Sequence, residues 1–171
     1  MRTKVLLSIF TLAVAADCLL FSGMTIMAQE SAECDAECRV QLAQARAGTA
    51  LYHDFDTAIA DGFTASGGCV SLPDGPAMGY HYRNAARVDQ IVNAPEPELI
   101  IYMPNEDGEL QLVAVEYIVP FTGSNPAPAL FGQTFHYNAA RSRYELHAWL
   151  WRNNPDGIFA DYNPRLRCPG A

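Results

Sequence analysis

Two imidazoles and one carboxylate are the side chains in this sequence best suited to bind a metal ion or to transfer protons. His81 lies between two tyrosines, and His147 stands two residues before a tryptophan. Glu116 is the single charge in an apolar run over 110–119. A buried carboxylate must be paired, protonated or bound to a cation, and two imidazoles with a carboxylate suit a divalent transition metal such as Zn, Cu or Fe. The sequence therefore predicts a buried metal or small-ligand site built from His81, Glu116 and His147, with His53 as a further metal ligand.

The predicted ligand pocket has aromatic walls. Two tyrosines flank His81 in a short strand between turns, and two tryptophans share the face of His147 when strand residues alternate. An imidazole in such a setting can bind a metal, act as a general base or be a hydrogen-bonded core residue. The expected wall residues are Tyr80, Tyr82, Trp149 and Trp151.

The same side chains also fit a protein without a catalytic or metal site. Glu116 can form a salt bridge with an arginine, for which Arg83 is the candidate, and the two imidazoles would then complete a polar core network.

His136 follows a loop rich in proline and glycine and is expected at the surface. No HExxH motif, GxSxG elbow or phosphate-binding glycine loop occurs, so no nucleotide cofactor is expected. An enzyme, a binding protein and a non-catalytic extracellular structural module all stay open.

The charge of the chain narrows its possible partners. The formal net charge is −8, and an acidic surface repels the phosphates of nucleic acids. Lys4 is the only lysine and lies in a segment predicted to be removed, which excludes Schiff-base chemistry from the finished protein. The expected partner is a metal ion or a small molecule, and the sequence leaves the oligomeric state open.

The N-terminus has the layout of a secretory signal. Two cations precede an apolar run, a second apolar stretch ends at Ala28, and the chain then becomes polar. We predict that residues 1–28 are a signal peptide and that residues 29–171 are a single disulfide-bridged globular domain, secreted or periplasmic, without a membrane span. An uncleaved anchor is the alternative, although Asp17 would cost roughly 2.5–3.5 kcal/mol at the centre of a spanning helix.

Four cysteines follow the predicted signal peptide. An even number in an oxidising compartment predicts two disulfides, for which three pairings exist. We expect Cys69 to pair with Cys168, which would tie the C-terminal part of the chain to the body of the fold. Cys34 and Cys38 would then pair across one helical turn. A metal–thiolate site is the alternative, but the spacing is not that of a zinc ribbon.

One helix is expected ahead of the strands that carry these residues. The stretch 31–59 is rich in helix formers and lacks proline. Its apolar stripe is expected to include Val40, Leu51 and Phe55, and Gly48 marks a point at which the helix could break.

The rest of the chain indicates an antiparallel sheet. Runs over 99–103 and 109–119 flank a turn and predict a β-hairpin, and 144–151 predicts another strand. Turn-forming residues over 153–164 predict a C-terminal segment that wraps the surface. The expected fold class is α+β, with an N-terminal helix packed on an antiparallel β-sheet or partly closed barrel.

Short motifs distributed along the chain include GYHY at 79–82, VAVEY at 113–117 and LHAWLWRNNP at 146–155. Through them the segment from about Thr49 to Pro169 resembles an uncharacterised family of exported bacterial proteins. The resemblance implies no activity, so the roles assigned above rest on residue chemistry. Cys34 and Cys38 lie outside it.

Overall fold

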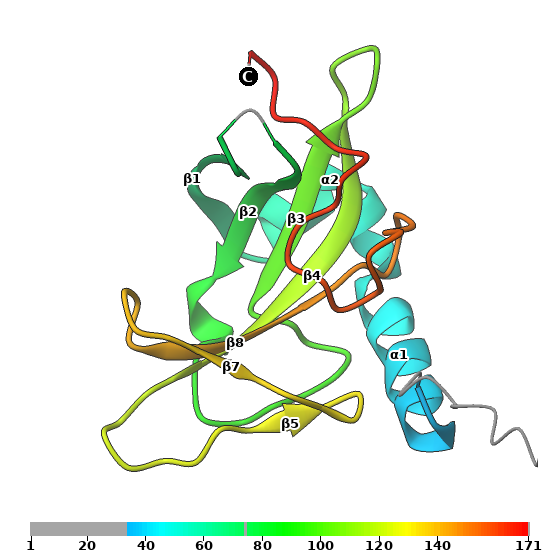
Figure 1. The fold of residues 1–171 in the computed structure, drawn as a ribbon. Helices are drawn as coiled ribbons and strands as arrows, with labels where there is room; N and C mark the ends of the chain where they lie inside the picture. Colours follow the sequence, from blue (N-terminus) through cyan, green and yellow to red (C-terminus); the bar gives the residue numbers. More distant parts are fainter. Residues whose placement is uncertain (1–33, 74, 171) are drawn as a thin grey trace, which may run out of the picture. The chain divides into compact units, whose positions relative to one another are not determined.

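An open antiparallel sheet of six strands organises the fold (Figure 1). The computed structural model describes residues 34–73 and 75–170, and the predicted signal peptide, 1–28, lies outside them. The strand order is β1-β2-β3-β4-β8-β7, and β5 and β6 form a separate pair. The α+β prediction is confirmed, and the sheet is not closed into a barrel. The strands are β1 (Phe63–Ser71), β2 (Ala77–Asn84), β3 (Leu99–Pro104), β4 (Leu110–Pro120), β5 (Ala129–Leu130), β6 (Gln133–Thr134), β7 (His136–Asn138) and β8 (Arg143–Ala148).

The predicted single helix is divided into three. They are α1 (Ala36–Thr49), the 3₁₀ helix η1 (Ala50–His53) and α2 (Phe55–Ala60), while a further 3₁₀ turn, η2 (Ala85–Arg87), follows β2. The Asp35 carboxylate caps α1 by accepting a hydrogen bond of 2.8 Å from the Cys38 backbone N–H. The Asp54 carboxylate caps α2 in the same way and starts it as a separate helix.

The buried face of α1 and η1 differs from the predicted apolar stripe. Val40 is 57% exposed and Leu51 is 48% exposed. The prediction was wrong at these two positions because it followed the larger apolar residues, whereas small and polar residues make much of the contact with the sheet. Phe55, also predicted, does pack against the core. The buried positions are Cys38, Leu42, Ala45, Thr49 and Tyr52.

Both faces of the sheet are covered. On the helix side, the Tyr102 hydroxyl donates to the Tyr52 carbonyl at 2.6 Å, and the Tyr117 hydroxyl donates to the Ala94 carbonyl at 2.5 Å. The C-terminal segment, 153–170, crosses the other face over β3 and β4 (Figure 1). Polar side chains in the middle of β4 are therefore buried on either face.

Both predicted disulfides are confirmed. Cys69 in β1 is bonded to Cys168 in the C-terminal segment, and Cys34 is bonded to Cys38 at the start of α1. The first bond joins residues 99 positions apart, which holds the C-terminal segment against the sheet. None of the helices in 34–73 and 75–170 is long and apolar enough to cross a membrane.

The two edges of the sheet differ in form. In β1 the pairing with β2 shifts between Ala65 and Cys69, so three residues of β1 lie opposite the single residue His81. Gly67, within this irregular stretch, has a φ of 112°, which favours glycine. The opposite edge strand, β7, contains only three residues.

At Gly48, helix α1 lies against the loop that contains Pro95, and a substitution there tests how close this contact is. The helix continues through Gly48, and a methyl group there would lie 2.2 Å from the Pro95 carbonyl oxygen. Alanine normally stabilises a helix by about 1 kcal/mol relative to glycine, but we expect Gly48→Ala to lower the free energy of unfolding by about 1–3 kcal/mol because the backbone must shift. Urea denaturation measures this.

The matched control is Gly68→Ala, since a methyl group on Gly68 meets nothing within 4 Å. Its free energy of unfolding is expected to change by less than about 0.5 kcal/mol. A Gly48→Ala variant more stable than the wild type would show that the contact with Pro95 is not made.

Candidate functional site

The strand register brings the three predicted site residues to one face of the sheet. Glu116 in β4 is paired directly with His147 in β8. His81 in β2 is paired with Ile101, which in turn is paired with Ala114, two residues before Glu116. Laterally paired residues share a face, and so do residues two apart along a strand. His81, Glu116 and His147 therefore all lie beneath the C-terminal segment, as the sequence predicted for a common site.

The His81 and Glu116 side chains lie close together without a hydrogen bond between them. His81 Nε2 is 3.6 Å from Glu116 Oε2, beyond ordinary hydrogen-bond length. His81 Nδ1 lies 3.2 Å from the Gly79 carbonyl oxygen, which can only accept. In the neutral ring Nδ1 therefore carries the hydrogen, and Nε2 presents its lone pair toward Glu116.

A cavity of about 220 Å³ lies against this pair. Its walls come from the sheet, the turn between β7 and β8, and the C-terminal segment. The polar residues that line it are Ser66, His81, Glu116, His136, Asn138, Arg141, Arg143, Glu145, Asp161 and Tyr162.

Glu145 is the charged carboxylate of the site. Its side chain accepts hydrogen bonds from Asn138, at 2.8 Å, and from Arg143, and His136 Nε2 lies 3.4 Å from Oε2. Burial alone would raise the pKa of Glu145, but the hydrogen bonds from Asn138 and Arg143 outweigh it and lower the pKa below its usual value. Arg143 is thereby engaged mainly with Glu145.

Glu116 is the uncharged carboxylic acid of the site. Burial, followed by the negative charge of Glu145, raises the pKa of Glu116 to about 8, although Arg143 and Arg141 oppose the shift. The Arg143 guanidinium approaches Glu116 Oε1 only to 3.6 Å. The arginine near Glu116 is therefore Arg143 rather than Arg83, and at neutral pH Glu116 is mainly protonated.

Both imidazoles are held neutral. Burial lowers the pKa of His81 to about 4 against the opposing hydrogen bond to Gly79, and Arg141 and Arg143 lower it further. Burial also lowers the pKa of His147 to about 3, with the positive forms of His81 and His136 acting in the same direction. At neutral pH the contact between His81 and Glu116 therefore joins a neutral base and a neutral acid.

His147 is 1% exposed, and neither ring nitrogen has a hydrogen-bond partner in 34–73 or 75–170. Its ring centroid lies 6.5 Å from that of His81 and 4.8 Å from that of Trp149. An unpaired buried polar group costs about 1–3 kcal/mol. A role in stabilising the core does not explain this imidazole.

The other predicted residues lie away from the cavity. His53 packs on Trp151 with ring centroids 4.4 Å apart, and the Trp151 Nε1 donates to the Thr49 hydroxyl on the helix side. Tyr82 packs on Phe55 on that same side. Tyr80 shares the face of Tyr82, because neighbours of His81 in a strand point away from it. Of the expected aromatic walls, Trp149 alone contacts an imidazole of the site.

The charged residues around the cavity, apart from Glu116, were not among the predicted site residues. Strand alternation from His147 back to Glu145 and Arg143 places all three on one face, so this signal was available. Arg141 and Asp161 lie in a turn and in the C-terminal segment, where no periodic pattern indicates direction.

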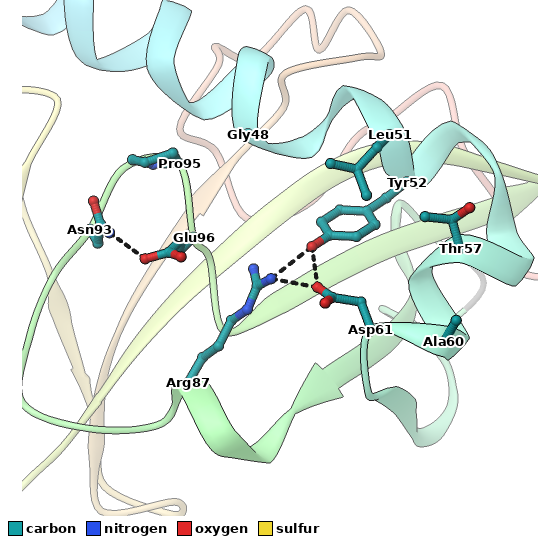
Figure 2. Close-up of a pocket in the computed structure, with 10 residues that line it drawn as sticks. All are labelled: Gly48, Leu51, Tyr52, Thr57, Ala60, Asp61, Arg87, Asn93, Pro95 and Glu96. Carbon is teal, nitrogen blue, oxygen red and sulfur yellow. Dashed lines mark hydrogen bonds and ion pairs between the residues drawn. The ribbon is translucent and has the colours of Figure 1, made fainter.

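A second, more open pocket of about 790 Å³ lies between the helices and the loop before β3 (Figure 2). Arg87 donates to the Tyr52 hydroxyl at 2.7 Å and to Asp61 Oδ2 at 2.6 Å, and Tyr52 also contacts Asp61 (Figure 2). The Arg87 guanidinium also lies over the Phe63 ring, 4.9 Å from its centroid. These polar groups satisfy one another and tie η1, α2 and η2 together, so we assign them a structural role.

No three His, Cys, Asp or Glu side chains in the described parts of the chain are arranged to hold a metal ion. The predicted metal ligands thus include one close pair, His81 and Glu116, with His147 beside it and His53 elsewhere. Metal binding stays a prediction.

The chain matches no protein-family model, no curated protein and no solved structure. The family resemblance stays a prediction, and function has to be argued from the site.

Glu116→Gln should show a pH-dependent gain in stability. The folded protein holds the Glu116 proton up to about pH 8, whereas the unfolded chain releases it near the ordinary pKa of 4.5. The wild type therefore loses stability as pH rises through this window, and glutamine, which cannot ionise, does not. Relative to wild type, we expect Glu116→Gln to gain on the order of 4 kcal/mol between about pH 5 and pH 8.

Urea denaturation at several pH values measures this gain. Glu109→Gln, in the exposed turn before β4, is the control and should differ from wild type by less than about 0.5 kcal/mol at every pH. A pH-independent difference for Glu116→Gln would show that Glu116 ionises in the folded protein much as it does in the unfolded chain.

His147→Leu should stabilise the protein. Leucine fills a similar volume without ring nitrogens to satisfy, so we expect the free energy of unfolding at pH 7 to rise by about 1–2 kcal/mol. Chemical denaturation measures this change, and His53→Leu, a substitution at an exposed position, is the control. A loss of more than about 1 kcal/mol in His147→Leu would instead favour the polar core network.

Proposed function

We propose that this chain is an exported protein that binds a small polar molecule in the cavity beside His81 and Glu116. These two residues act on the bound molecule as base and acid. The observation that carries the proposal is the gap of 3.6 Å between a neutral imidazole nitrogen and a carboxyl oxygen on the cavity wall. Perturbed acid and base groups that share a cavity are typical of functional sites.

The chemistry that suits this pair is proton transfer. A protonated Glu116 can donate to an oxygen or nitrogen of the bound molecule, and His81 Nε2 can accept a proton from another of its atoms. One proton leaves Glu116 as another arrives on His81, so the bound molecule keeps its total number of protons. The pKa of about 8 for Glu116 lies close to neutral pH, where a general acid works well.

The geometry favours a small molecule over the two alternatives. A polar core network would satisfy its members, yet His147 has no partner among the described residues, and no hydrogen bond joins His81 to Glu116. A metal site would need further ligands around the one close pair. The cavity instead offers donors and acceptors on several sides.

The proposed location is the periplasm or the extracellular medium. Two disulfides are present, and such bonds persist in oxidising compartments. The secretory layout of residues 1–28 supports the same location.

Binding can be tested with a library of small polar compounds. We expect at least one compound to shift the NMR signals of the His81 ring and of neighbouring cavity residues, with binding lost in His81→Ala. His53→Ala is the matched control, because His53 lies on the helix side beside Trp151, and should bind like the wild type. Binding that survives His81→Ala would contradict a site beside His81, and no binding at all would favour the non-catalytic structural module.

Metal analysis of protein purified without a histidine tag distinguishes a metal site from a small-molecule site. Stoichiometric Zn, Cu or Fe that is lost in His147→Ala and His81→Ala would support the metal site in place of the small-molecule site.

A further inference from the structure

Two opposite charges line the cavity without partners. The Arg141 guanidinium and the Asp161 carboxylate belong to exposed residues that line it. Neither side chain forms an ion pair or a hydrogen bond with any residue in 34–73 or 75–170, and the two are not paired with each other. One cation and one anion are therefore both available to a bound molecule.

The backbone around each of these charges is held in place. The Arg141 backbone N–H donates to the Asn138 side chain at 3.1 Å, which fixes the turn between β7 and β8. On the other side, the Ala160 carbonyl accepts from Trp149 Nε1 at 2.6 Å, and the Asn163 N–H donates to the Ala77 carbonyl at 3.0 Å. Asp161 lies between these two anchors. A backbone fixed near both residues lowers the entropic cost of placing their side chains on a ligand.

The charges deeper in the cavity are already engaged. Glu145 is bonded to Arg143 and Asn138, and Glu116 is mainly uncharged at neutral pH. A ligand with a single charge would pair with only one of Arg141 and Asp161. A ligand with both charges would pair with each.

We propose that the ligand is a small zwitterion, a free amino acid about the size of serine. Its carboxylate binds Arg141, its ammonium group binds Asp161, and its side chain faces His81 and Glu116. This inference rests on the proposed function of the cavity. Guanidinium groups bind carboxylates through two parallel hydrogen bonds. The cavity of about 220 Å³ is smaller than pockets for drug-sized molecules, which suits a ligand of this size.

Three matched probes separate the two charges. L-Serine carries both, L-serinamide lacks the carboxylate, and N-acetyl-L-serine lacks the ammonium group. We expect serine to bind the wild-type protein about 10- to 100-fold more tightly than either analogue, as measured by calorimetry or NMR titration.

Two variants assign each charge to its residue. Arg141→Gln should weaken serine about 10- to 100-fold and leave serinamide unchanged, and Asp161→Asn should weaken serine by a similar factor and leave N-acetylserine unchanged. Both residues are exposed, so the fold should tolerate both changes. Arg152→Gln and Asp107→Asn, exposed and absent from the lining of this cavity, are the controls and should bind serine like the wild type.

The outcomes distinguish this inference from the proposed function. Serinamide or N-acetylserine binding as tightly as serine would overturn the zwitterion while leaving the cavity as a binding site. The same conclusion would follow if no probe bound but a library compound bound in a His81-dependent way. The absence of both kinds of binding would overturn the inference together with the proposed function.

Discussion

Charged side chains in the middle of β4 and β8 are largely removed from bulk water, because the helices cover one face of the sheet and the C-terminal segment covers the other. This desolvation sets the protonation state of the polar groups between them. Glu145 stays ionised because Asn138 and Arg143 bind it directly. Glu116, one strand away, is left without a strong partner and keeps its proton. Two carboxyl groups on one face thus have opposite states, which is a common way for a protein to hold an acid at neutral pH.

The C-terminal segment connects stability with the site. Its contacts with Ala77 and Trp149 and the Cys69–Cys168 disulfide hold it on the sheet, and the same stretch supplies Asp161 to the cavity wall. The cavity therefore depends on a segment without regular secondary structure whose position is fixed by bonds at several points. The ring of His147 beneath it has no hydrogen-bond partner among the described residues, and this costs stability.

Sequence patterns predicted the α+β class and both disulfides, because strand periodicity and an even number of cysteines indicate them. His81, Glu116 and His147 were grouped by their chemistry, and the strand register shows that they share a face. The aromatic walls were misplaced, since Tyr80 and Tyr82 must point away from a residue that stands between them. The buried face of the helix differs from the predicted apolar stripe, because the small residues Ala45 and Thr49 are buried in place of larger apolar residues. Arg141 and Asp161 could not be assigned from the sequence, because their directions depend on a turn and on a tertiary anchor rather than on any repeat.

The irregular edge of the sheet has a consequence for how copies of this chain meet. An exposed edge strand offers unpaired backbone groups to which a strand of a neighbouring molecule could add, the first step toward fibrils. In β1 the bulge around Gly67 breaks the straight row of donors and acceptors, and at the opposite edge β7 is too short to template a long strand. Both edges therefore discourage strand addition at high concentration.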